Sequence, residues 1–207
     1  MFCGFEKYFP NLTNEQLDNL LNLREIYNHW NSMINVISRK DMDNFYTHHV
    51  LHSLAIAKFI NFMPGTTILD VGSGGGFPGI PLAILFPESE FTLLDSIDKK
   101  IKVITAVKNE LKLKNVTPLK KRIEEEKSRY HFVISRAVMK FPEFVKITRK
   151  NIHVNSINKI SNGIICLKGG DLTEELSSFT EKVKIYDISV FFAGQFFETK
   201  KIVYLPV

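Results

Sequence analysis

The first third of the chain carries apolar residues at helical spacing, in two stretches. Thr13 precedes Gln16 by three residues, which is the arrangement of a capping box, so a helix is predicted to begin near Thr13. The second stretch ends at Pro64 and Gly65. The apolar positions are Leu17, Leu20, Leu21, Tyr27 and Trp30 in the first stretch and Leu51, Leu54, Ala55, Phe59 and Phe62 in the second. We therefore expect residues 1–63 to form a helical cap.

From Thr66 onward, short apolar runs alternate with helical stretches. Strands are predicted at 67–71, 91–95, 116–119, 131–136 and 164–168, and the clearest helix at 98–113. This alternation predicts an α/β fold over residues 64–207, a doubly wound parallel sheet whose ligand lies at the carboxyl ends of the strands. The tail segments "KVKIYDISVFF" and "KKIVYLPV" predict an antiparallel hairpin that closes the sheet edge.

Composition narrows the class of protein. The 207 residues are 44% hydrophobic, which is enough for one sizeable core. No apolar run approaches the ~20 residues that cross a bilayer, and the start "MFCGFEKYFP" lacks a signal-peptide pattern, so we expect a cytoplasmic chain without a membrane segment. Cys3 and Cys166 are too few for a disulfide framework or a zinc cluster, so no metal is expected. We expect a monomer.

The charge balance is modestly basic. Lys and Arg number 27 against 22 Asp and Glu, giving a net charge of +5. Short basic clusters stand at Arg39-Lys40, Lys99-Lys100, Lys120-Lys121-Arg122 and Arg149-Lys150. Such clusters slightly favour a surface that meets nucleic acid over charges that serve solubility alone.

The stretch "ILDVGSGGGFPGI" places glycines directly after a predicted strand. A dinucleotide fingerprint requires glycine at the position of Phe77, so NAD binding is disfavoured. Gly72, Gly74 and Gly76, preceded by Asp70, instead follow the D-x-G-x-G-x-G pattern of S-adenosylmethionine sites. This cofactor carries an amino-acid moiety and a sulfonium rather than a pyrophosphate, and Asp70 is suited to the ammonium or sulfonium side.

Acids after the next two strands extend this cofactor site. Asp95 ends the second strand, where an acid accepts hydrogen bonds from ribose hydroxyls; its alternative role, capping the following helix, is better served by Asp98. Glu124, or the backbone around Ile123, is placed to receive the adenine edge. The alternative for Glu124 is a solvated acid in a basic loop.

The methyl acceptor is inferred by elimination. Methylation of an exocyclic base amine uses an N/D-P-P-Y/F/W motif after the fourth strand, where this chain reads "SRAVMK". Methylation of cytosine C5 requires a cysteine nucleophile, and Cys166 lies in a predicted buried strand. What remains is an acceptor that is already nucleophilic, such as guanine N7, for which alignment replaces a general base.

Two cations end predicted strands at the same sheet edge. Arg136 ends the fourth strand and Lys168 the fifth, so we expect both at the mouth of the cleft, holding RNA phosphate or guanine O6. The alternative for each is a salt bridge with a neighbouring acid.

These residues resemble a known family. "LDVGSGGGFPGIPLAILFPESEFTLLDSIDKK", "ISRA" and "LKGG" strongly resemble the RsmG (GidB) family of 16S ribosomal RNA methyltransferases. "WNSMINVIS" and "HHVLHS" look like the W-N-x-x-x-N-L-T and H-x-x-D-S stretches of that family, so the resemblance covers nearly the whole chain. It implies a Rossmann-like class I methyltransferase that uses S-adenosylmethionine to make 7-methylguanosine in 16S rRNA or the 30S subunit.

The resemblance also implies roles for individual residues. Cofactor contacts fall on Gly72, Phe77, Ile123, Glu124 and Arg136, and other motif positions on Asn35, His49, Ser53, Lys168 and Gly169. The chain departs from the family at Val36 and Ile37, which replace Leu-Thr, and at His52, which replaces the acid before Ser53. His48, His49 and His52 suggest a metal site as an alternative, but this spacing without an added acid or cysteine is more typical of polar helix contacts.

Three rival functions remain open on the sequence. A small-molecule methyltransferase on the same fold would need no basic mouth to its cleft. A ribosome-assembly factor without turnover would not need the intact glycines and Asp95. An NAD-dependent oxidoreductase is disfavoured by Phe77 and by the lack of an acid or base pair for hydride transfer.

Overall fold

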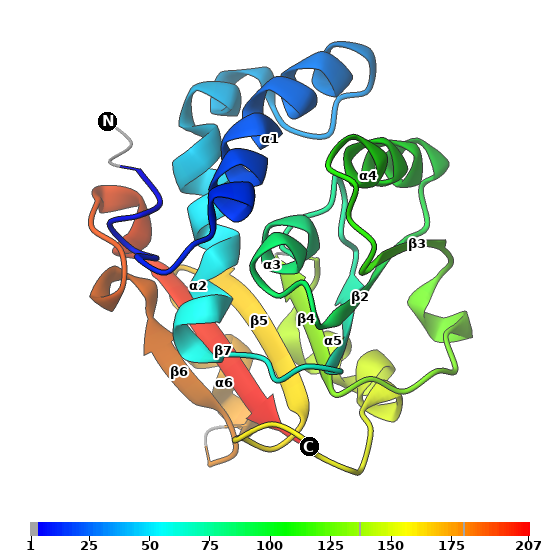
Figure 1. Ribbon diagram of the computed structural model, residues 1–207. Coiled ribbons are helices and arrows are strands. Elements are labelled where there is room, and N and C mark those ends of the chain that lie inside the picture. Colours follow the sequence, from blue (N-terminus) through cyan, green and yellow to red (C-terminus); the bar gives the residue numbers. More distant parts are fainter. Residues whose placement is uncertain (1–3, 137, 180) are drawn as a thin grey trace.

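The computed structural model describes residues 4–136, 138–179 and 181–207. They form a seven-stranded sheet in the order β3-β2-β1-β4-β5-β7-β6, with helices on both faces (Figure 1). The strands are β1 Thr67–Val71, β2 Glu90–Asp95, β3 Val116–Lys120, β4 Phe132–Arg136, β5 Gly163–Gly169, β6 Lys184–Asp187 and β7 Lys200–Pro206. The pairs among β1 to β5 are parallel, so the predicted doubly wound sheet is confirmed.

Alternation along the strands divides the core into two layers. Ile68 and Ile134 point into the larger layer, whereas their neighbours Leu69 and Val133 point into the smaller one, as the two-residue period of a strand requires. The helices are α1 Asn14–Met33, α2 His52–Phe59, α3 Gly79–Leu85, α4 Asp98–Glu110, α5 Phe141–Thr148 and α6 Thr173–Leu176. Helices α1 to α4 cover the larger layer, and α5 and α6 cover the smaller one.

The start of α1 follows the predicted signal, whereas two helices end earlier than predicted: α2 ends at Phe59 rather than at Pro64, and α4 is shorter as well. Thr13 and Gln16 form the predicted capping box at the start of α1. The Gln16 side chain also donates to the carbonyl oxygens of Ile84 and Leu85, which ties α1 to the end of α3. The helix predicted at 98–113 was too long: α4 ends at Glu110, and the backbone then turns through Lys112 with a φ of 55°.

The tail confirms the antiparallel pair and corrects its extent. Strand β7 pairs antiparallel with both β5 and β6, so it lies between them and β6 forms the edge. Strand β6 stops at Asp187 because the chain then enters a short 3-10 helix, Ile188–Val190. Ile188 and Phe192 are buried in the larger core layer. The chain leaves the exposed edge of the sheet after Asp187 and thereby brings these two side chains into the core.

The N-terminal residues share this core. A 3-10 helix, Arg39–Asn44, and a π-helix, Phe45–Leu51, connect α1 to α2. The larger core layer includes both Phe5 of the N-terminal segment and Tyr204 of β7, and α2 packs against α3 and β5. No helix in the described parts of the chain is both long and apolar enough to cross a membrane.

Candidate active site

A cavity of about 410 Å³ opens at the carboxyl ends of β1, β2 and β4. This is the edge where parallel α/β sheets bind ligands. Its wall brings together Gly72, Asp95, Ile123, Glu124 and Arg136, all of which sequence analysis assigned to the cofactor. The other predicted residues, Asp70, Gly74, Gly76 and Phe77, are not among the residues that line it.

The glycine-rich turn after β1 has a backbone that only glycine adopts easily. Gly72, Gly74 and Gly76 have φ angles of 68°, 58° and 109°, in the left-handed region. A Cβ added at Gly72 would lie 2.6 Å from Cγ2 of Val138, and one at Gly76 would lie 2.6 Å from Cγ1 of Ile80. The turn therefore presents bare backbone to the cavity at Gly72, while Gly76 permits close packing behind it.

Asp70 supports the turn from within the core. It is 0% exposed, and its Oδ2 accepts a hydrogen bond of 2.8 Å from the backbone N–H of Gly79, at the start of α3. Its Oδ1 is buried without a partner among the described residues. Burial raises the pKa of Asp70 to about 7, although the Gly79 hydrogen bond and the Arg136 charge act to lower it. Asp70 thus lies behind the cavity, next to the turn.

Asp95 faces the cavity and also fixes the turn. Its Oδ2 accepts from the Gly74 N–H at 3.0 Å and its Oδ1 from the Ile97 N–H at 2.9 Å. Asp98 makes no cap to α4, contrary to the expectation from sequence, because its carboxylate pairs with Lys102 and Lys120. The carboxylate that organises the start of α4 is therefore that of Asp95.

Phe77 anchors the other end of the turn in an aromatic cluster. Its ring centroid lies 4.8 Å from that of Tyr27, 5.9 Å from that of Phe45 and 5.5 Å from that of His49. The Tyr27 hydroxyl donates to the carbonyl oxygen of Gly75 at 2.5 Å, and burial raises the pKa of Tyr27 above its ordinary value. Helix α1 thus holds the turn directly.

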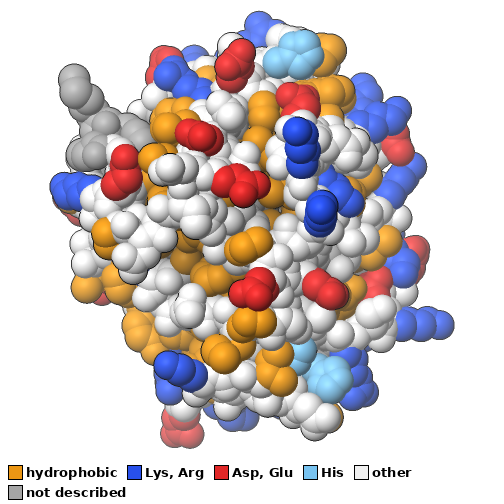
Figure 2. All heavy atoms as spheres, in the orientation of Figure 1, with side chains coloured by type: hydrophobic (Ala, Val, Ile, Leu, Met, Phe, Trp, Pro, Cys, Tyr) orange, Lys and Arg blue, Asp and Glu red, His pale blue; other side chains and the backbone are white. Residues whose placement is uncertain are grey.

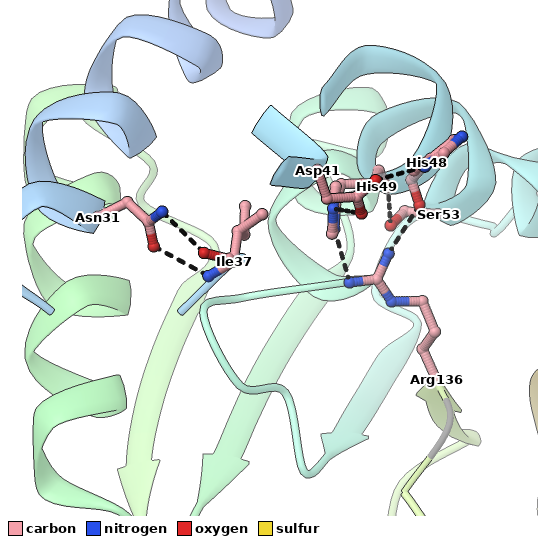
Figure 3. Close-up of polar contacts among 7 residues, drawn as sticks. All are labelled: Asn31, Ile37, Asp41, His48, His49, Ser53 and Arg136. Atoms are coloured by element: carbon pink, nitrogen blue, oxygen red, sulfur yellow. Dashed lines mark hydrogen bonds and ion pairs between the residues drawn. The ribbon is translucent and has the colours of Figure 1, made fainter. Parts of the chain in front are cut away.

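Arg136 connects the cavity to the N-terminal segment. Figure 3 shows its side chain extending from β4 toward the histidines of the π-helix. The guanidinium donates to the backbone oxygen of His48 at 3.1 Å, lies 3.2 Å from Nδ1 of His49, and lies 5.1 Å from the centre of the Phe77 ring. Burial lowers the pKa of Arg136 to about 10, so it remains a cation at neutral pH.

The histidine pair is held by one carboxylate. Asp41 Oδ1 lies 2.6 Å from Nδ1 of His48, and its Oδ2 lies 2.7 Å from Nε2 of His49 (Figure 3). Burial, and then the Arg136 charge, lower the pKa of His49 to about 4. A neutral His49 fits both contacts, because Nδ1 accepts from Arg136 while Nε2–H donates to Asp41.

Asn31 and Ser53, which lie in the two N-terminal motif stretches, make hydrogen bonds within the fold. Asn31 Oδ1 accepts from the N–H groups of Val36 and Ile37, both at 2.9 Å, and its Nδ2 donates to the Ile37 oxygen at 2.8 Å (Figure 3). Ser53 is buried and donates to the backbone oxygen of His49 at 2.6 Å. Asn35 is exposed. The segment after α1 is thereby fastened beside the glycine-rich turn.

Lys168 forms a salt bridge, which was the alternative to an RNA contact in the prediction from sequence. Its Nζ lies 2.7 Å from Glu175 Oε1 and donates to the Met139 backbone oxygen at 2.6 Å, and its side chain is 11% exposed. It does not line the cofactor cavity; it lines a neighbouring cavity together with Gly169. Two of the three Nζ donors are thus engaged within the fold, and the hold of Lys168 on RNA phosphate or guanine O6 stays a prediction.

Cys166 is excluded as a nucleophile by its surroundings. Its side chain is buried on β5, and burial raises the pKa of the thiol to about 12, so no thiolate forms at neutral pH. Cys3 lies outside the described residues. Within those residues, no cluster of three or more His, Cys, Asp or Glu side chains is arranged to hold a metal ion.

Three residues at this site have no distinctive signal in the sequence. Tyr27 looked like one more core residue of an amphipathic helix, and Asp41 lies in a polar stretch without periodicity. Glu175 stands in a segment for which no element was predicted. The Lys168–Glu175 spacing of seven residues carries no signal, because a β-strand end and a turn separate the two.

The surface beside the cavity is basic. Lys100, Lys121 and Arg122 line its mouth. Figure 2 shows basic side chains along the side of the molecule where Figure 1 places α4 and β3, with acidic side chains among them. The predicted clusters at 99–100 and 120–122 thus lie next to the cavity.

The fold and the cavity are those of a Rossmann-like α/β protein that binds its ligand at the carboxyl ends of parallel strands. A solved S-adenosylmethionine-dependent methyltransferase from Aquifex aeolicus shares the fold, with a TM-score of 0.52 and 16% identity over 74% of this chain and 88% of that one. The family model described as GidB, rRNA small subunit methyltransferase G, matches residues 16–203. The chain belongs to this family, as the sequence resemblance predicted.

Curated relatives agree along almost their whole length. Ribosomal RNA small subunit methyltransferase G of Phocaeicola vulgatus is 55% identical over 201 residues, covering 97% of this chain and 96% of the relative. The protein of the same name from Flavobacterium johnsoniae is 55% identical with the same coverage. The chain is accordingly an rRNA methyltransferase.

Proposed function

We propose that this chain transfers the methyl group of S-adenosylmethionine to N7 of a guanine in 16S rRNA of the small subunit. The observation that carries the proposal is the combination of family membership over residues 16–203 with a cavity lined by the glycine-rich turn, Asp95 and Arg136. In this proposal the chain acts as a monomer in the cytoplasm, where small subunits are assembled.

The residues of the cavity suit the cofactor. The bare backbone of Gly72 lines the cavity, so the methionine part is proposed to lie against it, with Asp70 behind the turn. Asp95 accepts from the Gly74 N–H with Oδ2 and from the Ile97 N–H with Oδ1. The remaining lone pairs of its carboxylate are proposed to accept from ribose hydroxyls, since a carboxylate offers about four. Ile123 and Glu124 form the wall proposed for the adenine, and Phe77 and Arg136 hold the turn in place.

The proposed acceptor fits the chemistry available. S-adenosylmethionine supplies an electrophilic methyl group on a sulfonium. Guanine N7 has a lone pair and no proton to lose, so the chain needs no general base, and Cys166 is too deeply buried to act as a nucleophile. The work left to the protein is alignment, which supplies up to ~7–11 kcal/mol in well-oriented reactions.

The basic surface supports an RNA substrate. Lys100, Lys121 and Arg122 line the cavity. Lys100 Nζ lies 3.6 Å from Asp95 Oδ2 and Lys121 Nζ lies 2.9 Å from Glu126 Oε2, so Arg122 is the cation proposed to meet phosphate of the strand that delivers the base. A small-molecule methyltransferase would gain nothing from these cations.

The test is to map N7-methylguanosine in ribosomal RNA from cells with and without the gene. The proposal predicts one N7-methylguanosine in 16S rRNA that is lost on deletion and restored by the wild-type gene. Restoration by wild type but not by Asp95→Ala would separate an enzyme from an assembly factor without turnover. An unchanged 16S methylation pattern would reject the proposal in favour of a small-molecule substrate or a non-catalytic role.

A further inference from the structure

A second cavity adjoins the cofactor cavity. It has a volume of about 350 Å³, within the range of small-ligand pockets, and the two cavities share Val138 and Met139 in their walls. Leu167 adds a further apolar surface. A flat base that enters this cavity lies against these apolar side chains, next to the cavity proposed for the cofactor.

Glu175 is fixed in this cavity with one oxygen unengaged. Its Oε1 accepts from Lys168 Nζ at 2.7 Å and from the backbone N–H of Phe141. No described residue donates a hydrogen bond to its Oε2. The Lys168 and Phe141 hydrogen bonds lower the pKa of this carboxyl group against the raising effect of burial, so it is ionised at neutral pH. Glu175 therefore presents an oriented, charged acceptor.

Donors stand in the same cavity. Lys200 and His52 line it with Glu175. His52 is 6% exposed, and its Nε2 is buried without a partner among the described residues. Burial and the neighbouring charges of Arg136, Lys200, His49 and His48 lower the pKa of His52, so its imidazole is neutral at neutral pH and donates from one ring nitrogen.

We propose that the second cavity binds the target guanine, turned out of the RNA stack, and that Glu175 selects it by accepting hydrogen bonds from N1–H and the exocyclic N2 amine. Lys168 is then a positioning residue that holds the carboxylate, while His52 and Lys200 supply donors toward O6. This inference rests on the proposed function and adds the residue that reads the base.

The arrangement excludes the other purine. Guanine offers donors at N1 and N2 and an acceptor at O6, which matches a carboxylate beside donor groups. Adenine has an acceptor at N1 and a donor at N6, so both sets of contacts are mismatched. Turning a base out of the stack costs free energy, and hydrogen bonds to the edge of the base offset this cost.

The experiment measures single-turnover methyl transfer to small subunits reconstituted with guanine or inosine at the mapped position. Inosine lacks the N2 amine and keeps N1–H, O6 and N7. Wild type is expected to methylate guanine about 10-fold faster than inosine, the value of a hydrogen bond to a charged group. A wild-type ratio near 1 would overturn the inference, whether or not any variant folds.

The variant Glu175→Gln isolates the unengaged oxygen. Its amide oxygen still accepts from Lys168 and Phe141, while an NH₂ donor replaces Oε2. We expect the guanine rate to fall about 10- to 100-fold, the ratio of guanine to inosine rates to fall within about 2-fold of 1, and S-adenosylhomocysteine affinity to stay within about 2-fold. Glu174→Gln, on the neighbouring exposed residue of α6, is the matched control and should keep both wild-type values.

The outcomes separate the two proposals. A wild-type protein that methylates no guanine N7 refutes the proposed function. The base-reading role of Glu175 is refuted separately. That outcome requires a wild-type protein that methylates guanine N7 and a Glu175→Gln variant that binds S-adenosylhomocysteine normally and keeps the wild-type ratio of guanine to inosine rates.

Discussion

At the scale of single residues, Asp70 and Asp95 were both predicted to contact the cofactor, but they occupy different places in the structure. Asp95 lines the cavity and fixes both the turn and the start of α4 through backbone N–H groups. Asp70 is sealed behind the turn and holds the start of α3. Sequence spacing places both acids at strand ends, and only packing decides which of them faces the ligand.

Asp95→Ala should weaken S-adenosylhomocysteine binding by ~1–3 kcal/mol, because ribose hydroxyls lose their acceptor and the Gly74 N–H loses its partner. Calorimetric titration measures this. Asp98→Ala, which removes a half-buried acid three residues away that pairs with Lys102 and Lys120, should bind like wild type. Equal affinity of the Asp95 variant and wild type would remove Asp95 from the site.

Asp70→Asn should make stability less dependent on pH. The folded pKa of Asp70, about 7, lies above its unfolded value, so the stability that protonated Asp70 contributes is lost as pH rises toward and through 7. Between pH 5 and 8 the free energy of unfolding of the variant should gain about 2–3 kcal/mol relative to wild type, at ~1.36 kcal/mol per pH unit.

Urea titrations at several pH values test this difference. Asp98→Asn is the control: hydrogen bonds from Lys120 and Lys102 lower the pKa of Asp98, so it finishes titrating below this range and its difference from wild type should stay flat. A flat difference for Asp70→Asn as well would mean that Asp70 does not titrate near neutrality.

At the scale of elements, the N-terminal helices act as the back wall of the site. Helix α1 reaches the glycine-rich turn through Tyr27, and the π-helix reaches β4 through the contacts of His48 and His49 with Arg136. A π-helix is rare and often marks a functional site. Its wider turn breaks the 3.6-residue period, which is why the apolar pattern predicted no helix for residues 45–50.

Tyr27→Phe should weaken both the fold and the site. Losing the hydroxyl leaves the buried Gly75 oxygen without its donor, at a cost of ~1–2 kcal/mol in the free energy of unfolding, and S-adenosylhomocysteine affinity should fall with it. Chemical denaturation and calorimetry measure the two effects. Tyr46→Phe, which removes an exposed hydroxyl bonded to the Leu21 oxygen, is the control. Affinity unchanged in Tyr27→Phe would show that α1 does not shape the turn.

At the scale of the whole molecule, local sequence patterns were sufficient to predict the strands of the sheet. They were insufficient to predict contacts between segments that are distant in the sequence. The strands and the glycine-rich turn follow from periods and motifs within a few residues, and they placed Gly72, Asp95 and Arg136 at one cavity. The bridge from Lys168 to Glu175 and the placement of Asp41 beside His49 depend on tertiary packing. No short-range pattern encodes these contacts.

Methyl transfer in vitro tests most directly whether this protein methylates N7 of a guanine in 16S rRNA. Purified protein is incubated with methyl-labelled S-adenosylmethionine and small subunits from cells lacking the gene, and the labelled nucleoside is identified. We expect close to one labelled methyl group per subunit, recovered from 16S rRNA as N7-methylguanosine. Subunits that stay unlabelled, or label recovered in any other nucleoside, would contradict this expectation.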